Sequence, residues 1–209
     1  MNLVPKPEQR KSLTDAARSY HNQIFDSEEH LMYLKSRGVT EDLMRSFGLG
    51  AVVEPDSSHE DFQGWISIPY ATPGGIVSIR FRRLLSDLQP KYMDLPGEPP
   101  RLYNPRALFR DETLFVCEGE LDAVVAWGAG LASVAVNGAE KWNRVFARIL
   151  SNRDVAVLQD GDDAGRKFAN KIYKDLGGCK VVKMPKGEDV SSFVTDHGVE
   201  AFREKVNHV

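Results

Sequence analysis

The chain has 209 residues, of which 42% are hydrophobic and 27% are charged, and its formal net charge is −3. This is the composition of a globular protein, and the length suits one large domain or two small ones. No apolar run approaches the roughly 20 residues of a membrane span, and the N-terminal segment lacks the apolar stretch of a secretion signal. We therefore expect a cytoplasmic protein with no membrane partner.

The two cysteines, Cys117 and Cys179, each lie within an apolar run, and we expect both to be buried free thiols. No CxxC pair is present, which excludes a zinc ribbon or zinc knuckle built by this chain alone. A GxxxxGK(S/T) phosphate-binding loop is also absent, so the sequence lacks the signature of an ATP-driven motor.

The first part of the chain is predicted to be helical after a polar start. Residues 1–22 are polar and contain two prolines, which predicts a mobile or loosely packed lead-in. Asp26 followed by Glu29 has the spacing of a capping box, and a helix is expected from there to the next glycine. Thr40 is placed to cap a second short helix that continues to Phe47.

The pattern changes from residue 64, where "GWISIPYATPGGIVSIRFRR" contains two extended runs around a Thr-Pro-Gly-Gly turn. This predicts a β-hairpin. In its second arm apolar residues alternate with polar and cationic ones, which predicts one apolar face and one cationic face. The alternating residues are Val77, Ile79 and Phe81 on one face and Ser78, Arg80 and Arg82 on the other. A proline-rich segment, residues 89–108, is expected to be an irregular linker.

From residue 111 short apolar runs alternate with amphipathic stretches. We predict strands at about 113–117, 132–136, 154–159 and 179–184, and helices at about 120–129, 142–151 and 163–176. Such alternation is typical of an α/β fold with a parallel sheet that helices cover on both faces.

Carboxylates follow these predicted strands: Glu118 comes after the first, Asp160 and Asp162 after the third, and Asp189 in the loop after the fourth. In an open α/β sheet ligands bind outside the carboxyl ends of the strands. Neighbouring like charges raise the energy of the site unless a cation is present. Mg²⁺ prefers oxygen ligands and is often shared between one or two carboxylates and substrate phosphates. The sequence therefore predicts a metal site at this edge.

Each of these carboxylates also has a simpler interpretation. Asp162 or Asp163 suits the N-cap of the helix predicted at 163–176. Glu118 or Glu120 suits the first turn of the helix predicted at 120–129. Asp189 alone is compatible with a solvated loop. Three acidic clusters at the carboxyl ends of strands in one predicted sheet favour the metal site.

The segments "VCEGELDAVVAWGAG", "SVAVNGAE" and "VAVLQDGDDAGRKFA" resemble a TOPRIM domain. This catalytic fold is shared by DnaG-type primases, type IA and type II topoisomerases and some nucleases. The motif glutamate is matched by Glu118 and the DxD pair by Asp160 and Asp162, and "EGELD" is similar to the primase "EGYMD", which implies a role for Asp122. "GEDVSSF" is similar to the primase "GEDPDxL", but Ser191 stands where the second aspartate would be.

The resemblance extends upstream through "YLKSRGVTEDLMRSFGLG", the predicted hairpin, "PKYMDLPG" and "LYNPRAL", which follow the order of a DnaG-type polymerase domain. It covers about residues 27–196. After the polar lead-in over 1–22, it implies an amino-terminal α+β subdomain over 23–110 and a TOPRIM domain with a C-terminal helix over 111–209.

The resemblance implies that the chain is a primase core that makes short RNA primers on a single-stranded DNA template from ribonucleoside triphosphates. Glu118, Asp160 and Asp162 would be catalytic, and with Asp189 they would hold Mg²⁺ or Mn²⁺. The implied nucleotide and nucleic-acid contacts are Arg80, Arg82, Lys91, Arg101 and Asp122. A replicative helicase and a separate zinc-binding domain are the implied protein partners, in a bacterial cell or a phage-infected host.

Other interpretations stay open. Residues 80–110 carry seven basic and three acidic side chains, which suits phosphate binding but also a solvated face. Aromatic residues in the same region suit base stacking or a core; they are Trp65, Tyr70, Phe81 and Tyr92. The acidic site also suits a TOPRIM nuclease, and Ser191 keeps open a catalytically weak module that binds single strands or a replisome partner.

Overall fold

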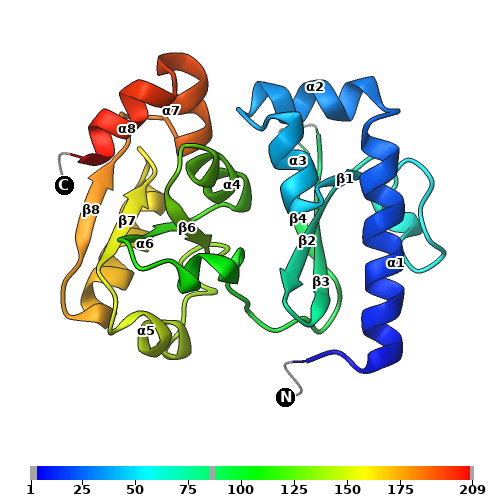
Figure 1. Cartoon of the computed structure of the whole chain (residues 1–209), viewed down its shortest axis with the longest axis horizontal. Coiled ribbons are helices and arrows are strands. Elements are labelled where there is room, and N and C mark those ends of the chain that lie inside the picture. The colour runs from blue at the N-terminus through cyan, green and yellow to red at the C-terminus, as the bar shows by residue number, and fades with distance from the viewer. Residues whose placement is uncertain (1–3, 85–87, 208–209) are drawn as a thin grey trace. The chain divides into compact units, whose positions relative to one another are not determined.

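The computed structural model describes residues 4–84 and 88–207 (Figure 1). The chain forms two compact units, Met1–Pro99 and Pro100–Val209. The predicted boundary lay after residue 110. Residues 100–110 group with the second unit because Tyr103 forms a β-bridge with Ala135 and the Asn104 side chain donates to the Ser133 carbonyl at 2.7 Å.

The first unit begins with a long helix, α1 (Pro7–Ile24), where the sequence predicted a mobile lead-in. That prediction was wrong for the described part of the segment, residues 4–22; residues 1–3 lie outside the described chain. Ala16, Ala17, Tyr20 and Ile24 are buried, and their spacing of three and four residues places them on one helix face. Pro7 stands at the first helical position, where a backbone N–H would have no partner within the helix, and Pro5 precedes the helix.

Two shorter helices follow, α2 (Glu28–Ser36) and α3 (Glu41–Phe47). The predicted capping box at Asp26 was wrong, because α2 begins after Ser27 and has no side-chain cap. The cap of α3 is confirmed: Thr40 accepts a hydrogen bond from the backbone N–H three residues on at 3.3 Å.

A four-stranded antiparallel sheet completes the first unit, in the order β1-β2-β3-β4. Its strands are β1 (Gly50–Ala51), β2 (Ile66–Thr72), β3 (Gly75–Arg82) and β4 (Tyr92–Asp94), and a short 3-10 helix, η1 (Glu60–Phe62), precedes β2. The predicted hairpin is confirmed as β2 and β3. The proline-rich segment is not wholly irregular, because β4 lies within it and pairs with β3. Phe62 and Phe81 stack at 3.9 Å in the core beneath α1.

The second unit contains a parallel sheet in the order β6-β5-β7-β8, so the predicted α/β class is confirmed. Its strands are β5 (Leu114–Cys117), β6 (Ala132–Ala135), β7 (Val155–Gln159) and β8 (Lys180–Lys183). Its helices are η2 (Pro105–Phe109), α4 (Glu120–Gly128), α5 (Arg144–Leu150), α6 (Asp163–Leu176), α7 (Val190–His197) and α8 (Val199–Asn207). Each predicted strand and helix of this half is present, with ends that differ by no more than two residues.

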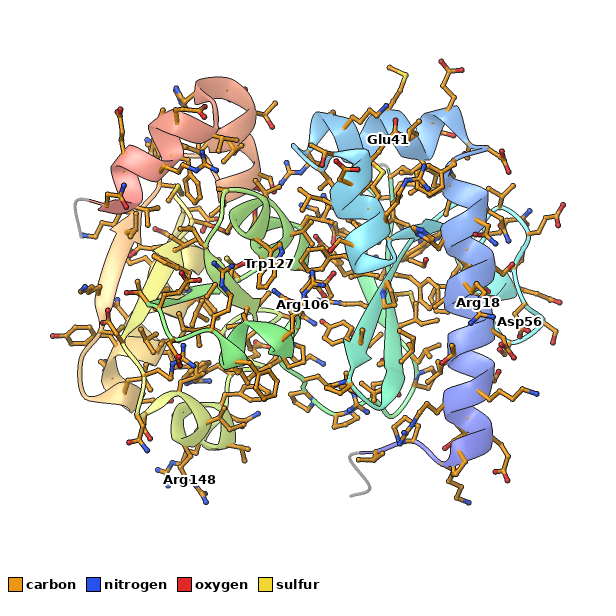
Figure 2. The ribbon with its side chains drawn as sticks, in the orientation of Figure 1. Arg18, Glu41, Asp56, Arg106, Trp127 and Arg148 are labelled. Carbon is orange, nitrogen blue, oxygen red and sulfur yellow. The ribbon has the colours of Figure 1, made fainter. Side chains whose placement is uncertain are left out.

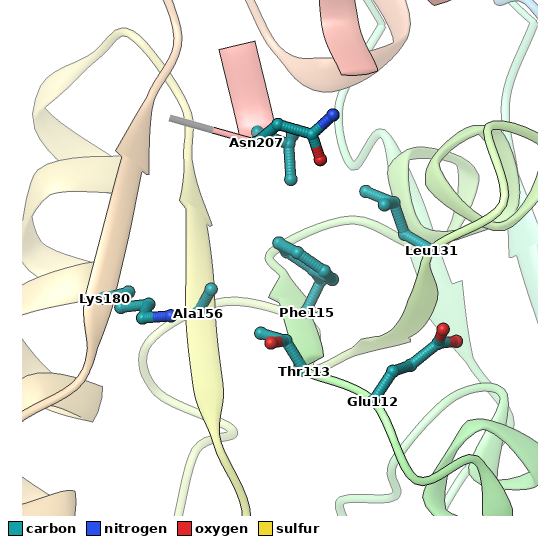
Figure 3. Close-up of a pocket in the computed structure, with 8 residues that line it drawn as sticks. Glu112, Thr113, Phe115, Leu131, Ala156, Lys180 and Asn207 are labelled. Atoms are coloured by element: carbon teal, nitrogen blue, oxygen red, sulfur yellow. The ribbon is translucent and has the colours of Figure 1, made fainter. Parts of the chain in front are cut away.

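Both faces of the parallel sheet are covered. Val116 and Val157 pack with Phe146 of α5 and Phe168 of α6 in one core. On the opposite face α4 packs against β6, where the Ser133 hydroxyl donates to the Ala123 carbonyl at 2.7 Å. Phe115 lines a cavity of about 260 Å³ beside the end of α8 (Figure 3). This cavity lies at the amino ends of the strands, whereas the predicted metal site belongs to their carboxyl ends.

Of the two free thiols, Cys117 is buried as expected and Cys179 is only partly buried, contrary to the prediction. None of the helices in the described ranges has the length and apolar character needed to cross a bilayer.

Candidate active site

The strand order brings the predicted acidic residues to one edge of the second unit. Glu118 follows β5, Asp160 follows β7, and Asp189 closes the loop after β8. These three strands are adjacent and parallel, so their carboxyl ends lie at the same edge, about 4.8 Å apart from strand to strand. The sheet therefore brings together carboxylates from three separate loops.

Two of these aspartates also cap helices. Asp162 accepts a hydrogen bond from the Gly165 backbone N–H at 2.7 Å, at the start of α6. Asp189 accepts from the Ser192 backbone N–H at 2.7 Å, at the start of α7. The capping interpretation is confirmed for Asp162, whereas the cap at Asp189 was not predicted, since the sequence suggested a solvated loop there. Capping and cation binding are compatible, because a carboxylate has two oxygens and several lone pairs.

Glycine at position 161 is required by the approach of two loops. Gly161 exchanges backbone hydrogen bonds with the loop after β8, donating to the Glu188 carbonyl at 2.8 Å and accepting from the Gly187 N–H at 3.0 Å. A Cβ at Gly161 would lie 1.7 Å from the Pro185 carbonyl oxygen, well inside contact distance. The glycine between the two aspartates therefore fixes the distance between the loops that carry Asp160 and Asp189.

Burial and mutual repulsion perturb the carboxylates strongly. Burial, followed by the charges of Asp162 and Asp122, raises the pKa of Glu118. The pKa of Asp160 is raised to about 9, first by burial and then by Asp122, Asp189, Glu118 and Asp162. Such shifts arise where like charges lie close together in a poorly solvated place, and they are typical of functional sites.

A divalent cation would relieve this repulsion, and the donor set fits one in part. Oε2 of Glu118 is buried and has no hydrogen-bond partner among the described residues. No three acidic, histidine or cysteine side chains of the described chain are disposed to coordinate one ion together. The arrangement thus suits an ion that one or two carboxylates hold and that takes its remaining oxygens from water or phosphate, as is usual for Mg²⁺.

Asp122, which the sequence assigned to nucleotide contacts, is only 7% exposed. Its Oδ1 accepts two hydrogen bonds from Ser191, one from the backbone N–H at 2.9 Å and one from the hydroxyl at 2.8 Å. Sequence reasoning noted Ser191 only as a departure from the motif and missed this contact. The spacing gave no signal for it, because the two residues are 69 positions apart.

The basic strand of the first unit differs from its prediction. Ile79 and Phe81 are buried as expected, but Arg82 on the predicted cationic face is only 3% exposed. Its guanidinium donates to the Tyr33 and Tyr92 hydroxyls. The prediction of a solvated cationic face is therefore wrong at Arg82, because tyrosines from α2 and β4 cover its side chain.

The other predicted basic contacts are more accessible. Arg80 is mostly buried, with its side chain 13% exposed; it forms an ion pair with Asp94 at 3.2 Å and lies 4.6 Å from the centre of the Tyr92 ring. Lys91 of the first unit and Arg101 of the second are half-buried. Three of the four aromatics considered for base stacking are core residues: Trp65, Tyr70 and Phe81.

One cationic cluster of the second unit was not predicted. The Arg106 guanidinium lies 4.6 Å from the centre of the Trp127 ring (Figure 2), and the Arg110 guanidinium lies 5.1 Å from it. Arg106 is held there by a 2.8 Å hydrogen bond from its Nε to Asn104. Cation–π contacts of this kind follow from the fold, and the spacing of these residues in the sequence does not indicate them.

Comparison with known proteins places these features in context. A family model described as "Toprim-like" matches residues 115–194. The Gene 57 protein of Mycobacterium phage D29 is 41% identical over 152 residues, which cover 69% of this chain and 99% of the phage protein. The DNA primase of Enterococcus faecalis is 27% identical over an alignment that covers 98% of this chain. This chain spans only 42% of that primase's length.

The fold is also that of a solved structure. The crystal structure of the Aquifex aeolicus primase, comprising zinc-binding and RNA polymerase domains, matches 98% of this chain with a TM-score of 0.78 and 24% sequence identity. The match covers 62% of the Aquifex chain. The likeness includes the antiparallel unit as well as the parallel one.

Proposed function

Because the chain belongs to the DnaG-type primase family, as an RNA polymerase domain that contains TOPRIM, we propose that it synthesises short RNA primers on single-stranded DNA. The observation that carries the proposal is the acidic edge of the parallel sheet, where burial and four neighbouring carboxylates raise the pKa of Asp160 and a buried oxygen of Glu118 has no hydrogen-bond partner among the described residues. A site of this kind attracts a divalent cation and the phosphates that accompany it.

In this proposal Glu118 and Asp160 hold the cation, Mg²⁺ or Mn²⁺, with Asp162 and Asp189 completing the acidic surroundings. When bound, the ion supplies the positive charge that offsets the charge developing on the reacting phosphate. Glu118 has a second possible role, because a carboxylate with a raised pKa is a suitable acceptor for the proton of an attacking 3′ hydroxyl. Asp162 and Asp189 keep their capping hydrogen bonds and so fix the loops on either side.

The basic residues have separate tasks in this proposal. Arg80, Lys91 and Arg101 bind template or triphosphate oxygens, arginine through the two N–H groups of its fork. Arg82 instead supports β3 from within, since its guanidinium is used by two tyrosine hydroxyls. The antiparallel unit favours a primase over a TOPRIM nuclease, because the primase relatives match 98% of the chain in sequence and in fold.

The proposal extends to partners. The curated bacterial primase spans more than twice the aligned length, and the Aquifex structure contains a zinc-binding domain. We propose that a zinc-bearing domain or partner selects the template for this chain, and that a replicative helicase delivers the single strand in a bacterial cell or a phage-infected host.

The deciding experiment offers the chain single-stranded DNA, ribonucleoside triphosphates and Mg²⁺ or Mn²⁺. Short oligoribonucleotides are expected, in low yield and with little sequence preference, and Asp160→Asn is expected to abolish them. Adding a zinc-binding primase domain in trans should raise the yield. Strand cleavage without nucleotide incorporation, lost in Asp160→Asn, would identify a nuclease instead.

A further inference from the structure

Ser191 and Asp122 join two helices at the back of the acidic edge. Ser191 lies in the first turn of α7 and is 0% exposed, and Asp122 lies in the first turn of α4. Both donors of Ser191, the backbone N–H and the hydroxyl, point at the same oxygen, Oδ1 of Asp122. Two donors on one carboxylate oxygen hold that oxygen in place, and hydrogen bonds of this kind favour a carboxylate over a neutral acid.

The second carboxylate oxygen of Asp122 is confined as well. A Cβ at Gly119 would lie 2.5 Å from Oδ2 of Asp122, so this oxygen occupies the space above the glycine that follows Glu118. The side chain is thus held from two sides, by α7 at one oxygen and by the Glu118–Gly119 backbone at the other. It has little freedom to turn toward an ion outside.

We propose that Ser191 and Asp122 are a positioning pair: Ser191 fixes Asp122 as a buried anion behind Glu118 and Asp160, where its charge strengthens divalent-cation binding although Asp122 is not itself a ligand. This inference rests on the proposed function, because it concerns the same metal site. It replaces the direct nucleotide contact that the sequence assigned to Asp122.

The electrostatics of the site support this arrangement. Among neighbouring charges, Asp122 is the largest contributor to the raised pKa of Asp160, and it also raises that of Glu118. A negative charge fixed beside these two residues also attracts a divalent cation held by them, so it strengthens the binding of that cation. The hydroxyl of Ser191 holds the Asp122 carboxylate in place without adding a further ligand.

The test measures Mn²⁺ binding to the purified chain by electron paramagnetic resonance, with Mn²⁺ as the only added ligand. Asp122→Asn keeps the shape and removes the charge, and it should weaken Mn²⁺ binding about tenfold or more with the number of bound ions unchanged. Ser191→Ala should weaken binding by a smaller factor, about threefold. Ser191→Cys, which retains a weak donor of similar size, should fall between wild type and Ser191→Ala.

Ser133→Ala is the matched control. Ser133 is also 0% exposed, and its hydroxyl also donates to α4, but to the Ala123 backbone carbonyl at 2.7 Å. It should lower thermal stability as Ser191→Ala does while leaving Mn²⁺ affinity unchanged. This comparison separates a loss of cation binding from a general loosening of α4.

The outcomes are distinguishable. A wild-type chain that binds no Mn²⁺ contradicts the proposed function, and with it this inference. If wild type binds Mn²⁺ and Asp122→Asn binds it equally well, only the positioning pair is overturned. A reduced number of bound ions in Asp122→Asn would make Asp122 a ligand. Equal losses of Mn²⁺ affinity in Ser133→Ala and Ser191→Ala would show that Ser191 has only a structural role. Either result contradicts the inference.

Discussion

Replacing Asp160 with asparagine should stabilise the metal-free protein, and the gain should grow with pH. Asparagine keeps the shape of the side chain but cannot ionise. In wild type, burial and four neighbouring carboxylates raise the pKa of Asp160 from 3.8 to about 9. Between these two values the unfolded chain has released a proton that the folded chain retains, so the free energy of unfolding falls as pH rises.

The size of the effect follows from that shift. Each pH unit between the two pKa values costs up to about 1.4 kcal/mol of stability. From a pKa of 3.8 in the unfolded state to pH 7 the wild type loses up to about 4 kcal/mol, and by pH 9 up to about 7 kcal/mol. These losses of stability are upper limits, because neighbouring carboxylates take up protons as Asp160 ionises and so reduce the repulsion. The variant lacks this loss, so the two proteins should be equally stable near pH 4 and diverge above it.

The assay is urea denaturation in a chelator at pH 5, 7 and 9, followed by the same series with Mg²⁺. A bound cation offsets the repulsion, so Mg²⁺ should reduce the difference between wild type and Asp160→Asn. Asp154→Asn is the control of opposite sign. A hydrogen bond from Thr113, followed by the charge of Lys180, lowers the pKa of Asp154, so that substitution should remove a small stabilisation present at neutral pH.

An Asp160→Asn variant that is less stable than wild type at all three pH values would refute the reasoning. So would a difference that does not change between pH 5 and pH 9, because repulsion among ionised carboxylates cannot be independent of their ionisation.

Three further predictions concern Gly161, Arg82 and Lys91. Gly161→Ala should lower the free energy of unfolding by about 2 kcal/mol or more in urea denaturation, because the new Cβ meets the backbone of Pro185. Gly74→Ala should change it by less than about 0.5 kcal/mol, because the new Cβ meets the flexible end of Arg10 and otherwise only makes an ordinary contact with the Thr72 hydroxyl. Arg82→Ala should lower stability by about 2 kcal/mol or more because it empties a buried site between two tyrosines, and the salt dependence of single-stranded DNA binding should stay unchanged. Lys91→Ala should leave stability nearly unchanged and reduce the salt slope of single-stranded DNA binding by about one. Fluorescence titration over a salt series measures both slopes. A reduced slope in Arg82→Ala with an unchanged slope in Lys91→Ala would make Arg82 the phosphate contact.

The sequence alone determined the α/β unit and the placing of its acidic residues. Short apolar runs alternating with amphipathic stretches are local patterns, and a parallel sheet is the arrangement that buries all of them. Glu118 and Asp160 directly after strands, and Asp189 in the loop after the next strand, were enough to predict a shared acidic edge, because parallel strands end at one edge. The caps at Thr40 and Asp162 were predictable for the same reason, since an N-cap acts on backbone only two or three residues away.

Only the tertiary structure decided what covers each surface and which distant groups meet. The alternation in β3 showed that Arg82 faces away from Phe81, but only the packing of Tyr33 and Tyr92 shows that this second face is buried too. The Ser191–Asp122 contact joins residues 69 positions apart. Periodicity in a sequence shows which face of one helix or strand is apolar. Whether the opposite face is also buried, which loops hydrogen-bond and how far the pKa of a crowded carboxylate shifts depend on elements that folding brings together.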